Sequence, residues 1–276
     1  MPNETDRPTE SATIRTLLVI PVEVAGRLAV SVAAADLRAS TETLTLTASD
    51  GSAVPHREVT LDRGMRLHVI DAPQGEVTLT YDATVALTAA EPEQVSDADA
   101  FTYILPSRYC PSDRLTGLAN TEFGHIESDA VRARRIVSWV HERLSYVPGT
   151  TTATDDALTP LLGGLGVCRD YAHLVVALAR AVGMPARYVS VYAPGLSPMD
   201  AHAVVEIGVD GTWFVFDATR LAPRRSMVRI GTGRDAADVA VLSSLGGANG
   251  LTYFEVTATA SPVLPDEDPD DLVTLG

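Results

Sequence analysis

Residues 166–173 are Gly166-Val167-Cys168-Arg169-Asp170-Tyr171-Ala172-His173. This glycine-rich approach brings one cysteine to the expected first turn of a long helix. Unpaired N–H groups and the positive end of the helix dipole favour the thiolate there, and the thiolate is the nucleophilic form of cysteine. The stretch therefore predicts a reactive thiol at Cys168 rather than a buried, inert one.

The helix expected after Cys168 is apolar on nearly every side as far as Val182. We expect a helix of this kind to be buried in the middle of a domain, because it has no polar face to expose to solvent. Gly183 and Pro185 supply the stop signals. We expect its burial to fix the position of the thiol at its first turn.

A histidine and an aspartate follow on two expected strands, 201–209 and 212–219, joined by Asp210-Gly211. That dipeptide is a strong signal for a two-residue hairpin turn. In the resulting register, His202 and Asp217 lie on one face as diagonal neighbours, about 7–8 Å apart at the backbone. A turn one residue longer would put them on opposite faces.

The three side chains suggest a nucleophile, a base and an orienting acid. We interpret His202 as the base for Cys168, and Asp217 as the partner that fixes its tautomer and orientation. A metal site built from the same three residues is the main alternative, although their spacing is a weak zinc signal. Cys110 has no evident base nearby and is interpreted as structural, and His173 as a packing or capping residue.

The region before this core has a different pattern. Residues 13–87 contain six short runs rich in Val, Leu and Thr and separated by Gly, Pro, Asp and Ser, which predicts a small antiparallel sandwich or barrel. We therefore expect an all-β domain over residues 1–95 and an α+β catalytic core over 96–262. The acidic segment 263–276 is expected to be a disordered tail.

Composition excludes several classes of function. The 276-residue chain is 46% hydrophobic, so a proper core is expected, and its net charge of −15 argues against nucleic acid or an anionic membrane as partner. No apolar run reaches the roughly 18 residues of a membrane helix. The polar N-terminus lacks a secretory pattern, which predicts a cytoplasmic protein. No zinc or calcium motif is visible, so no cofactor is expected.

Several stretches together resemble the transglutaminase-like superfamily, and more closely its bacterial cysteine-peptidase branch. They are Gly166–Ala172, Gly183–Arg187, Asp200–Glu206 and Trp213–Thr219 in the core, with Pro106–Tyr109 before it and Gly231–Asp238 after it. The resemblance covers residues 100 to 260. It implies a papain-like core, in which a helix with an N-terminal cysteine packs on an antiparallel sheet, with Cys168, His202 and Asp217 as the triad.

Two positions depart from the family pattern. Val204 stands where the family often has an aromatic residue, and Ala218 where it often has proline. Both leave the triad intact and bear on specificity. The position six before the cysteine, a glutamine in papain-like proteases, is Leu162, so only the Cys168 N–H is an evident oxyanion donor. Tyr146 is a candidate for the second by analogy.

The reaction expected is acyl transfer through a thioester on a peptide or protein amide substrate. Water as the acceptor makes the chain a peptidase or amidase, which the resemblance favours. A primary amine as the acceptor makes it a cross-linking enzyme, and deamidation is a further outcome with the same triad. A binding module that retains the fold without catalysis is the alternative from a different class.

Overall fold

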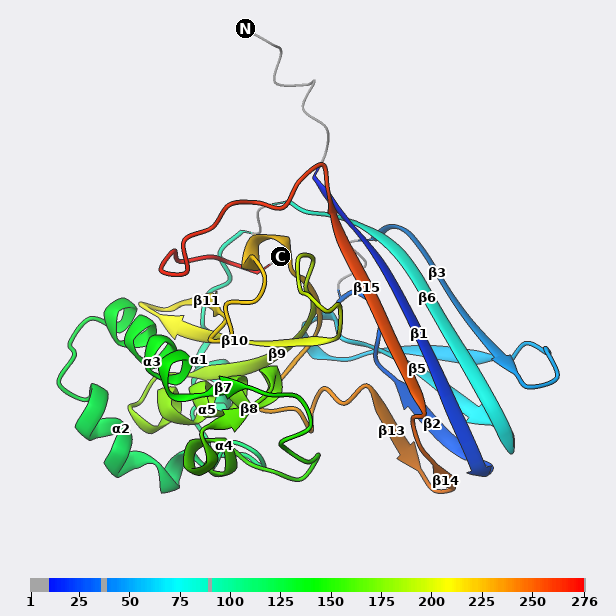
Figure 1. Cartoon of the computed structure of the whole chain (residues 1–276), viewed down its shortest axis with the longest axis horizontal. Helices are drawn as coiled ribbons and strands as arrows, with labels where there is room; N and C mark the ends of the chain where they lie inside the picture. Colours follow the sequence, from blue (N-terminus) through cyan, green and yellow to red (C-terminus); the bar gives the residue numbers. More distant parts are fainter. Residues whose placement is uncertain (1–9, 36–38, 89–90, 276) are drawn as a thin grey trace, which may run out of the picture.

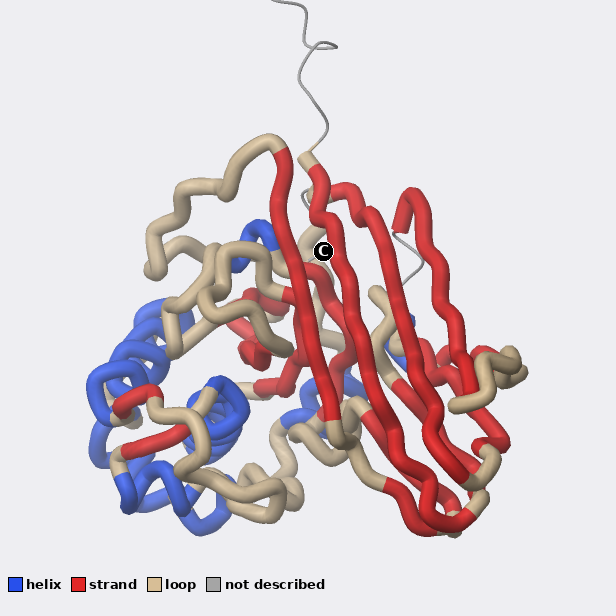
Figure 2. The backbone as a smooth tube through the Cα atoms, turned by 45° about the vertical axis from the view of Figure 1, so that its right-hand side comes forward, coloured by secondary structure: helices blue, strands red, loops and turns tan. Residues whose placement is uncertain are grey.

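The computed structural model describes residues 10–35, 39–88 and 91–275. A β sandwich and an α+β unit lie side by side, and the chain passes from the first to the second and back (Figure 1). The helices gather in the α+β unit, whereas long strands dominate the sandwich (Figure 2). The predicted α+β class, with a β region before the core, is confirmed.

Two antiparallel sheets form the sandwich, ordered β14-β1-β6-β3, with β15 also paired to β1, and β13-β2-β5-β4. Alternation along β1 explains the packing, because Ile14, Leu18 and Ile20 are buried while Arg15 faces solvent. Full burial of each such aliphatic side chain contributes about 1.5–3 kcal/mol. The strands are β1 (Ser11–Val24), β2 (Gly26–Val30), β3 (Ala39–Ala48), β4 (His56–Thr60), β5 (Arg66–Ala72), β6 (Gly75–Ala86), β13 (Leu242–Leu245), β14 (Ala248–Asn249) and β15 (Tyr253–Ser261).

The last three strands of the chain complete the sandwich. β15 pairs with β1 from Ser11↔Ser261 to Val19↔Tyr253, and β13 pairs with β2. The expected boundary, which assigned residues 96–262 to the core, therefore differs from the structure over residues 242–261. No strands were predicted over these residues, and their partners lie more than 200 positions away in the sequence.

The α+β unit is built on a four-stranded antiparallel sheet, ordered β11-β10-β9-β12. Its strands are β9 (Ala186–Tyr192), β10 (His202–Val209), β11 (Thr212–Phe216) and β12 (Val228–Gly233). The helices are α1 (Asp97–Tyr103), α2 (Thr116–Phe123), α3 (Asp129–Arg143), α4 (Leu158–Gly163) and α5 (Cys168–Ala181). Short 3-10 turns cover Asp62–Gly64, Ser112–Arg114 and Arg224–Ser226. Among the described residues, no helix combines the length and apolar character that crossing a membrane requires.

Helix α5 lies at the centre of this unit. Every residue from Asp170 to Arg180 is buried, and the helix packs against β9, β10, α2, α3 and α4. It ends before Gly183, whose φ of 83° is accessible to glycine at little cost. The predicted central helix with Cys168 at its first position is confirmed.

The hairpin between β10 and β11 has the predicted two-residue turn. Asp210 and Gly211 have φ of 48° and 81°, as a type I′ turn requires. The ladder runs from Val209↔Thr212 to Val205↔Phe216, which is the register expected from the sequence. It brings the start of β10 and the end of β11 to the same place in the sheet.

The acidic C-terminal segment is packed rather than disordered. The N–H of Val215 in β11 donates to the Val273 carbonyl at 2.8 Å, and Val273 and Leu275 are buried in an apolar cluster under the sheet. Two of the acids of the segment form ion pairs, Glu267 with Arg224 and Asp271 with Arg225. The charge of this segment predicted disorder, whereas its two apolar residues, Val273 and Leu275, pack against the sheet.

Candidate active site

Cys168 is the first residue of α5, and its side chain is partly exposed. Its Sγ lies 4.0 Å from the carbonyl oxygen of Ala201, the residue before His202. The residue is therefore partly open to solvent, and its thiol borders the start of β10. The predicted reactive position is accessible.

Asp170 ties the approach loop to the helix. Its carboxylate is buried, and Oδ2 accepts hydrogen bonds from the Val167 N–H and the Thr151 hydroxyl, both at 2.8 Å. A Cβ on Gly166 would lie 2.8 Å from the Asp170 Cβ, so glycine is needed at that position. The sequence analysis assigned Asp170 only a favourable charge at the helix start. Its position at N3, three residues after the N-cap, was the signal for this bond.

His202 and Asp217 meet as the hairpin register predicts. His202 opens β10, Asp217 follows β11, and Nε2 of the imidazole lies 2.9 Å from Oδ2 of the carboxylate. The second carboxylate oxygen accepts hydrogen bonds from the N–H and the hydroxyl of Thr219, at 2.8 and 2.7 Å. Both side chains are buried, so the imidazole is held in one orientation.

The electrostatics of this pair favour a charged imidazole. Burial alone would lower the pKa of His202, but the charge and hydrogen bond of Asp217, with a smaller contribution from Cys168, raise it to about 10. Burial acts to raise the pKa of Asp217, yet contacts with His202 and Thr219 leave it below its ordinary value. The buried ion pair is therefore the favoured form at neutral pH.

The other imidazole nitrogen is available to the thiol. Nδ1 of His202 is buried and has no hydrogen-bond partner among the described residues. Because Nε2 is occupied by Asp217, Nδ1 is the atom that can exchange a proton with Cys168. The influence of Cys168 on the pKa of His202 agrees with this arrangement.

Tyr146 completes the surroundings of the thiol. β7 (Ser145–Tyr146) runs parallel to β8 (Leu165–Gly166), so Tyr146 pairs with Gly166 two residues before Cys168. Burial first, and then the charge of Cys168, raise the pKa of the Tyr146 hydroxyl to about 12, and the hydroxyl also interacts with the Cys168 N–H. It therefore stays protonated at neutral pH. Leu162 is 86% exposed and is directed to solvent.

A network behind the nucleophile joins the two flanking stretches of the resemblance. The Asp235 carboxylate accepts the Tyr109 N–H at 2.9 Å, and His173 Nε2 accepts the Ala236 N–H at 3.1 Å. The Tyr109 ring stacks between His173, at 5.2 Å, and the guanidinium of Arg169, at 4.5 Å. Burial keeps the pKa of His173 well below its ordinary value, so it is a neutral acceptor, in line with its interpretation as a capping residue.

Arg169 also anchors the loop beside the thiol. Its guanidinium donates to the carbonyls of Thr152, Ala153 and Asp155 at 3.1–3.2 Å. Sequence reasoning did not find this role, because the three acceptors are backbone carbonyls of a loop and leave no side-chain signature.

Cys110 has the properties of a structural thiol. It is fully buried, it is not bonded to Cys168, and burial raises its pKa to about 12. The two cysteines of the chain are therefore in opposite environments.

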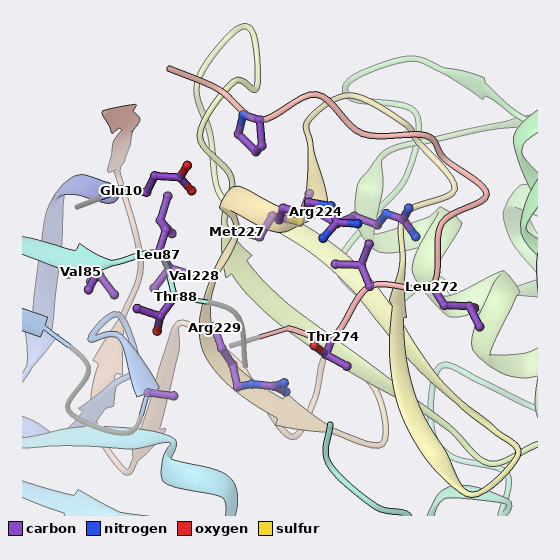
Figure 3. Close-up of a pocket in the computed structure, with 15 residues that line it drawn as sticks. Glu10, Val85, Leu87, Thr88, Arg224, Met227, Val228, Arg229, Leu272 and Thr274 are labelled. Carbon is purple, nitrogen blue, oxygen red and sulfur yellow. The ribbon is translucent and has the colours of Figure 1, made fainter. Parts of the chain in front are cut away.

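A cavity of about 220 Å³ lies apart from these residues, between the sandwich strands and the C-terminal segment (Figure 3). Its wall includes Arg224 and Arg229, whose charges are paired with Glu267 and Glu206. It contains no nucleophile and borders none of Cys168, His202 and Asp217. We regard it as a gap between packed segments.

Known proteins share this architecture. A model of the transglutaminase-like superfamily matches residues 117–218, a range that contains Cys168, His202 and Asp217. A solved structure from Cytophaga hutchinsonii, of a protein provisionally named a cysteine protease, is 31% identical with a TM-score of 0.85. The match covers 97% of this chain and 96% of that one.

Two mycobacterial relatives are named only as uncharacterized proteins. The Mycobacterium leprae protein is 28% identical over 207 residues, which are 67% of this chain and 73% of the relative. A Mycobacterium tuberculosis protein is 32% identical over 130 residues, which are 41% of this chain and 40% of that protein. The full-length structural likeness and the family match confirm the papain-like α+β fold.

Proposed function

The chain belongs to the transglutaminase-like superfamily, and from this premise we propose that it is an enzyme of acyl transfer on amide bonds, with Cys168, His202 and Asp217 as its triad. The observation that carries the proposal is the 2.9 Å contact of the buried His202–Asp217 pair, beside a partly exposed thiol. Burying an ion pair carries a desolvation penalty that can exceed the Coulombic gain, so a role in chemistry would explain why one is kept. Here it leaves one imidazole nitrogen free next to a nucleophile.

In the first step, the thiolate of Cys168, whose proton is held at Nδ1 of the charged His202, attacks the amide carbonyl carbon. The C–S bond forms and the carbonyl electrons move to oxygen, giving a tetrahedral oxyanion. When the oxyanion collapses, the C–N bond breaks, the imidazolium gives its proton to the leaving nitrogen, and an acyl-thioester remains on Cys168. The raised pKa of His202 supports storage of that proton between the two events.

Two groups are suited to stabilise the oxyanion. The N–H of Cys168 belongs to the first turn of α5, where it has no helical acceptor. The Tyr146 hydroxyl interacts with the same N–H and with the thiol, and it remains protonated because its pKa is raised. We propose that Tyr146 supplies the second donor, at the position left open by Leu162.

We propose hydrolysis as the reaction that completes the cycle. Water, deprotonated by His202, attacks the thioester carbonyl, the C–S bond breaks and the carboxylic acid leaves. The support is the provisional name of the Cytophaga relative, which is similar to this chain along its full length. A primary amine in place of water would give a cross-link by the same steps.

Product analysis tests this proposal. Wild type and Cys168→Ala are incubated with a peptide library and a bacterial lysate, and the products are identified by mass spectrometry. We expect new peptide termini, or glutamine converted to glutamate, that depend on Cys168. Isopeptide cross-links would show that the acyl group passes to an amine instead of water. Identical products from both proteins would refute catalysis.

A further inference from the structure

An acid that forms no ion pair lies close to the proposed site. Asp200 belongs to the loop between β9 and β10, and it is exposed. The carbonyl of the next residue, Ala201, lies 4.0 Å from the Cys168 Sγ. The acid is therefore one residue from a backbone atom that contacts the nucleophile, and two residues from His202.

The carboxylate of Asp200 retains an uncompensated charge. Its Oδ1 accepts the Ala201 N–H at 2.7 Å, and no basic side chain of the described residues lies within ion-pair distance of it. The arginine nearest the nucleophile in sequence, Arg169, is engaged by three loop carbonyls and the Tyr109 ring. Among the described residues, neither Arg169 nor another basic side chain forms an ion pair with Asp200.

The charge of Asp200 also reaches the groups around the thiol. It is one of the causes, after burial and the interactions with Cys168, that raise the pKa of the Tyr146 hydroxyl. The carboxylate therefore lies close enough to the Tyr146 hydroxyl to influence it electrostatically, and that hydroxyl in turn interacts with Cys168. Tyr146 and Met199 are 40% and 46% exposed, so the acid is set among apolar surface.

We propose that Asp200 is a specificity residue that selects amide substrates carrying a positive charge next to the bond that is broken. A cationic side chain on either flank of the scissile amide would sit beside an exposed carboxylate that has no partner of its own. The inference rests on the proposed function for its substrate, but the charge selection itself can be measured without one. An exposed charge pair should change the rate of the favoured substrate about 1.4- to fivefold at low salt, and attraction of a cation together with repulsion of an anion should change their ratio about three- to tenfold.

Charged thiol reagents measure this selection directly. Two methanethiosulfonates, one with a trimethylammonium group and one with a sulfonate group, are reacted with Cys168 in wild type, Asp200→Asn and Asp200→Arg. Asparagine keeps the oxygen that accepts the Ala201 N–H, so the loop geometry is retained. Glu76→Gln, an exposed acid of the sandwich, controls for the net charge of −15, and circular dichroism monitors the fold of each variant.

We expect Asp200→Asn to lower the ratio of cationic to anionic labelling about three- to tenfold, Asp200→Arg to lower it further, and Glu76→Gln to leave it within about twofold of wild type. Added salt should reduce the wild-type ratio. Equal ratios in wild type and both Asp200 variants would overturn the proposal.

The product analysis supplies the substrate side of the test. Arginine and lysine should be enriched next to the bonds that wild type attacks, and Asp200→Asn should remove the enrichment through KM more than through kcat. Products without such enrichment overturn the proposal even if hydrolysis occurs. If no Cys168-dependent product forms, the proposed function fails, while the labelling ratio still decides whether Asp200 selects charge.

Discussion

Gly166 and Asp170 approach so closely that a single methyl group would not fit between them. A Cβ at residue 166 would lie 2.8 Å from the Asp170 Cβ and 3.1 Å from its Oδ2. The contact holds the last residue of β8 against the carboxylate that binds the Val167 N–H. The position of the nucleophile therefore depends on the absence of a side chain two residues before it.

Gly166→Ala tests the contact between Gly166 and Asp170. Gly166→Ala should force Asp170 away from the Val167 N–H, lower the free energy of unfolding by about 1–3 kcal/mol, and reduce kcat/KM by more than the loss of folded protein explains. Gly117→Ala in α2 is the matched control. It has open space around its Cβ position, so it should be neutral or stabilise by up to about 1 kcal/mol. Urea unfolding and steady-state kinetics give both quantities, and equal behaviour of the two variants would contradict the packing argument.

Cysteine alkylation should separate the two thiols. Iodoacetamide should modify Cys168 in the native protein, because it is partly exposed beside a charged imidazole. Cys110 should react only after unfolding, since it is fully buried and its pKa is raised to about 12. His202→Ala should slow the labelling of Cys168 at neutral pH. Intact-mass and peptide analysis at several pH values would measure this, and equal, slow labelling of both thiols would favour the non-catalytic binding module.

The His202–Asp217 pair should make stability depend on pH. The pKa of His202 is raised in the folded state to about 10, against about 6.5 in the unfolded chain. Its contribution is therefore fully present below about pH 6.5 and is lost as the pH rises toward 10. The pKa of Asp217 is lowered, so its contribution is present above about pH 4 and is lost in acid.

Asp217→Asn tests this coupling in a Cys168→Ala background, which removes the titration of the thiol. The difference in unfolding free energy between parent and Asp217→Asn should be largest near pH 6 and should shrink steadily toward pH 10. Urea titrations across that range measure it, and a constant difference would mean that the imidazole is not charged in the fold. With Cys168 present, Asp217→Asn should lower kcat/KM at least about a hundredfold.

Tyr146→Phe tests the second oxyanion donor. Loss of one such hydroxyl should lower kcat about ten- to a thousandfold while KM changes little, because the interaction develops in the transition state. Tyr253→Phe, which removes an exposed hydroxyl of the sandwich, should leave both constants unchanged. A rise in KM with constant kcat would instead make Tyr146 a substrate-binding residue.

Local signals explain which parts of the fold could be predicted. The glycine before Cys168, the apolar run after it and the Asp210-Gly211 turn each act within a few residues. They were enough for the central helix and for the register that joins His202 to Asp217. These short-range rules carry most of the candidate site, because its base and acid lie on one hairpin.

Long-range contacts explain what could not be predicted. Nothing near Tyr253 indicates that β15 pairs with β1, and no pattern around Arg169 reveals that its guanidinium stacks on Tyr109 and holds the loop carbonyls. The shape of the tertiary fold and its unpaired backbone groups determine these contacts, and the local sequence does not. Tyr146 was a candidate by family analogy alone, since only the pairing of β7 with β8 brings it to the thiol.

The C-terminal segment gives the last prediction. Val273 is 4% exposed and its carbonyl accepts the Val215 N–H, two residues before Asp217, so the segment acts as an extra edge of the sheet that carries the acid. Val273→Ala should lower the free energy of unfolding by about 1–3 kcal/mol. Val263→Ala, at a residue that is 70% exposed in the same segment, should stay within about 0.5 kcal/mol of wild type. Urea unfolding of the two variants measures the difference. If both are neutral, the segment does not support the sheet in solution, and the acid of the proposed triad is held by Thr219 and His202 alone.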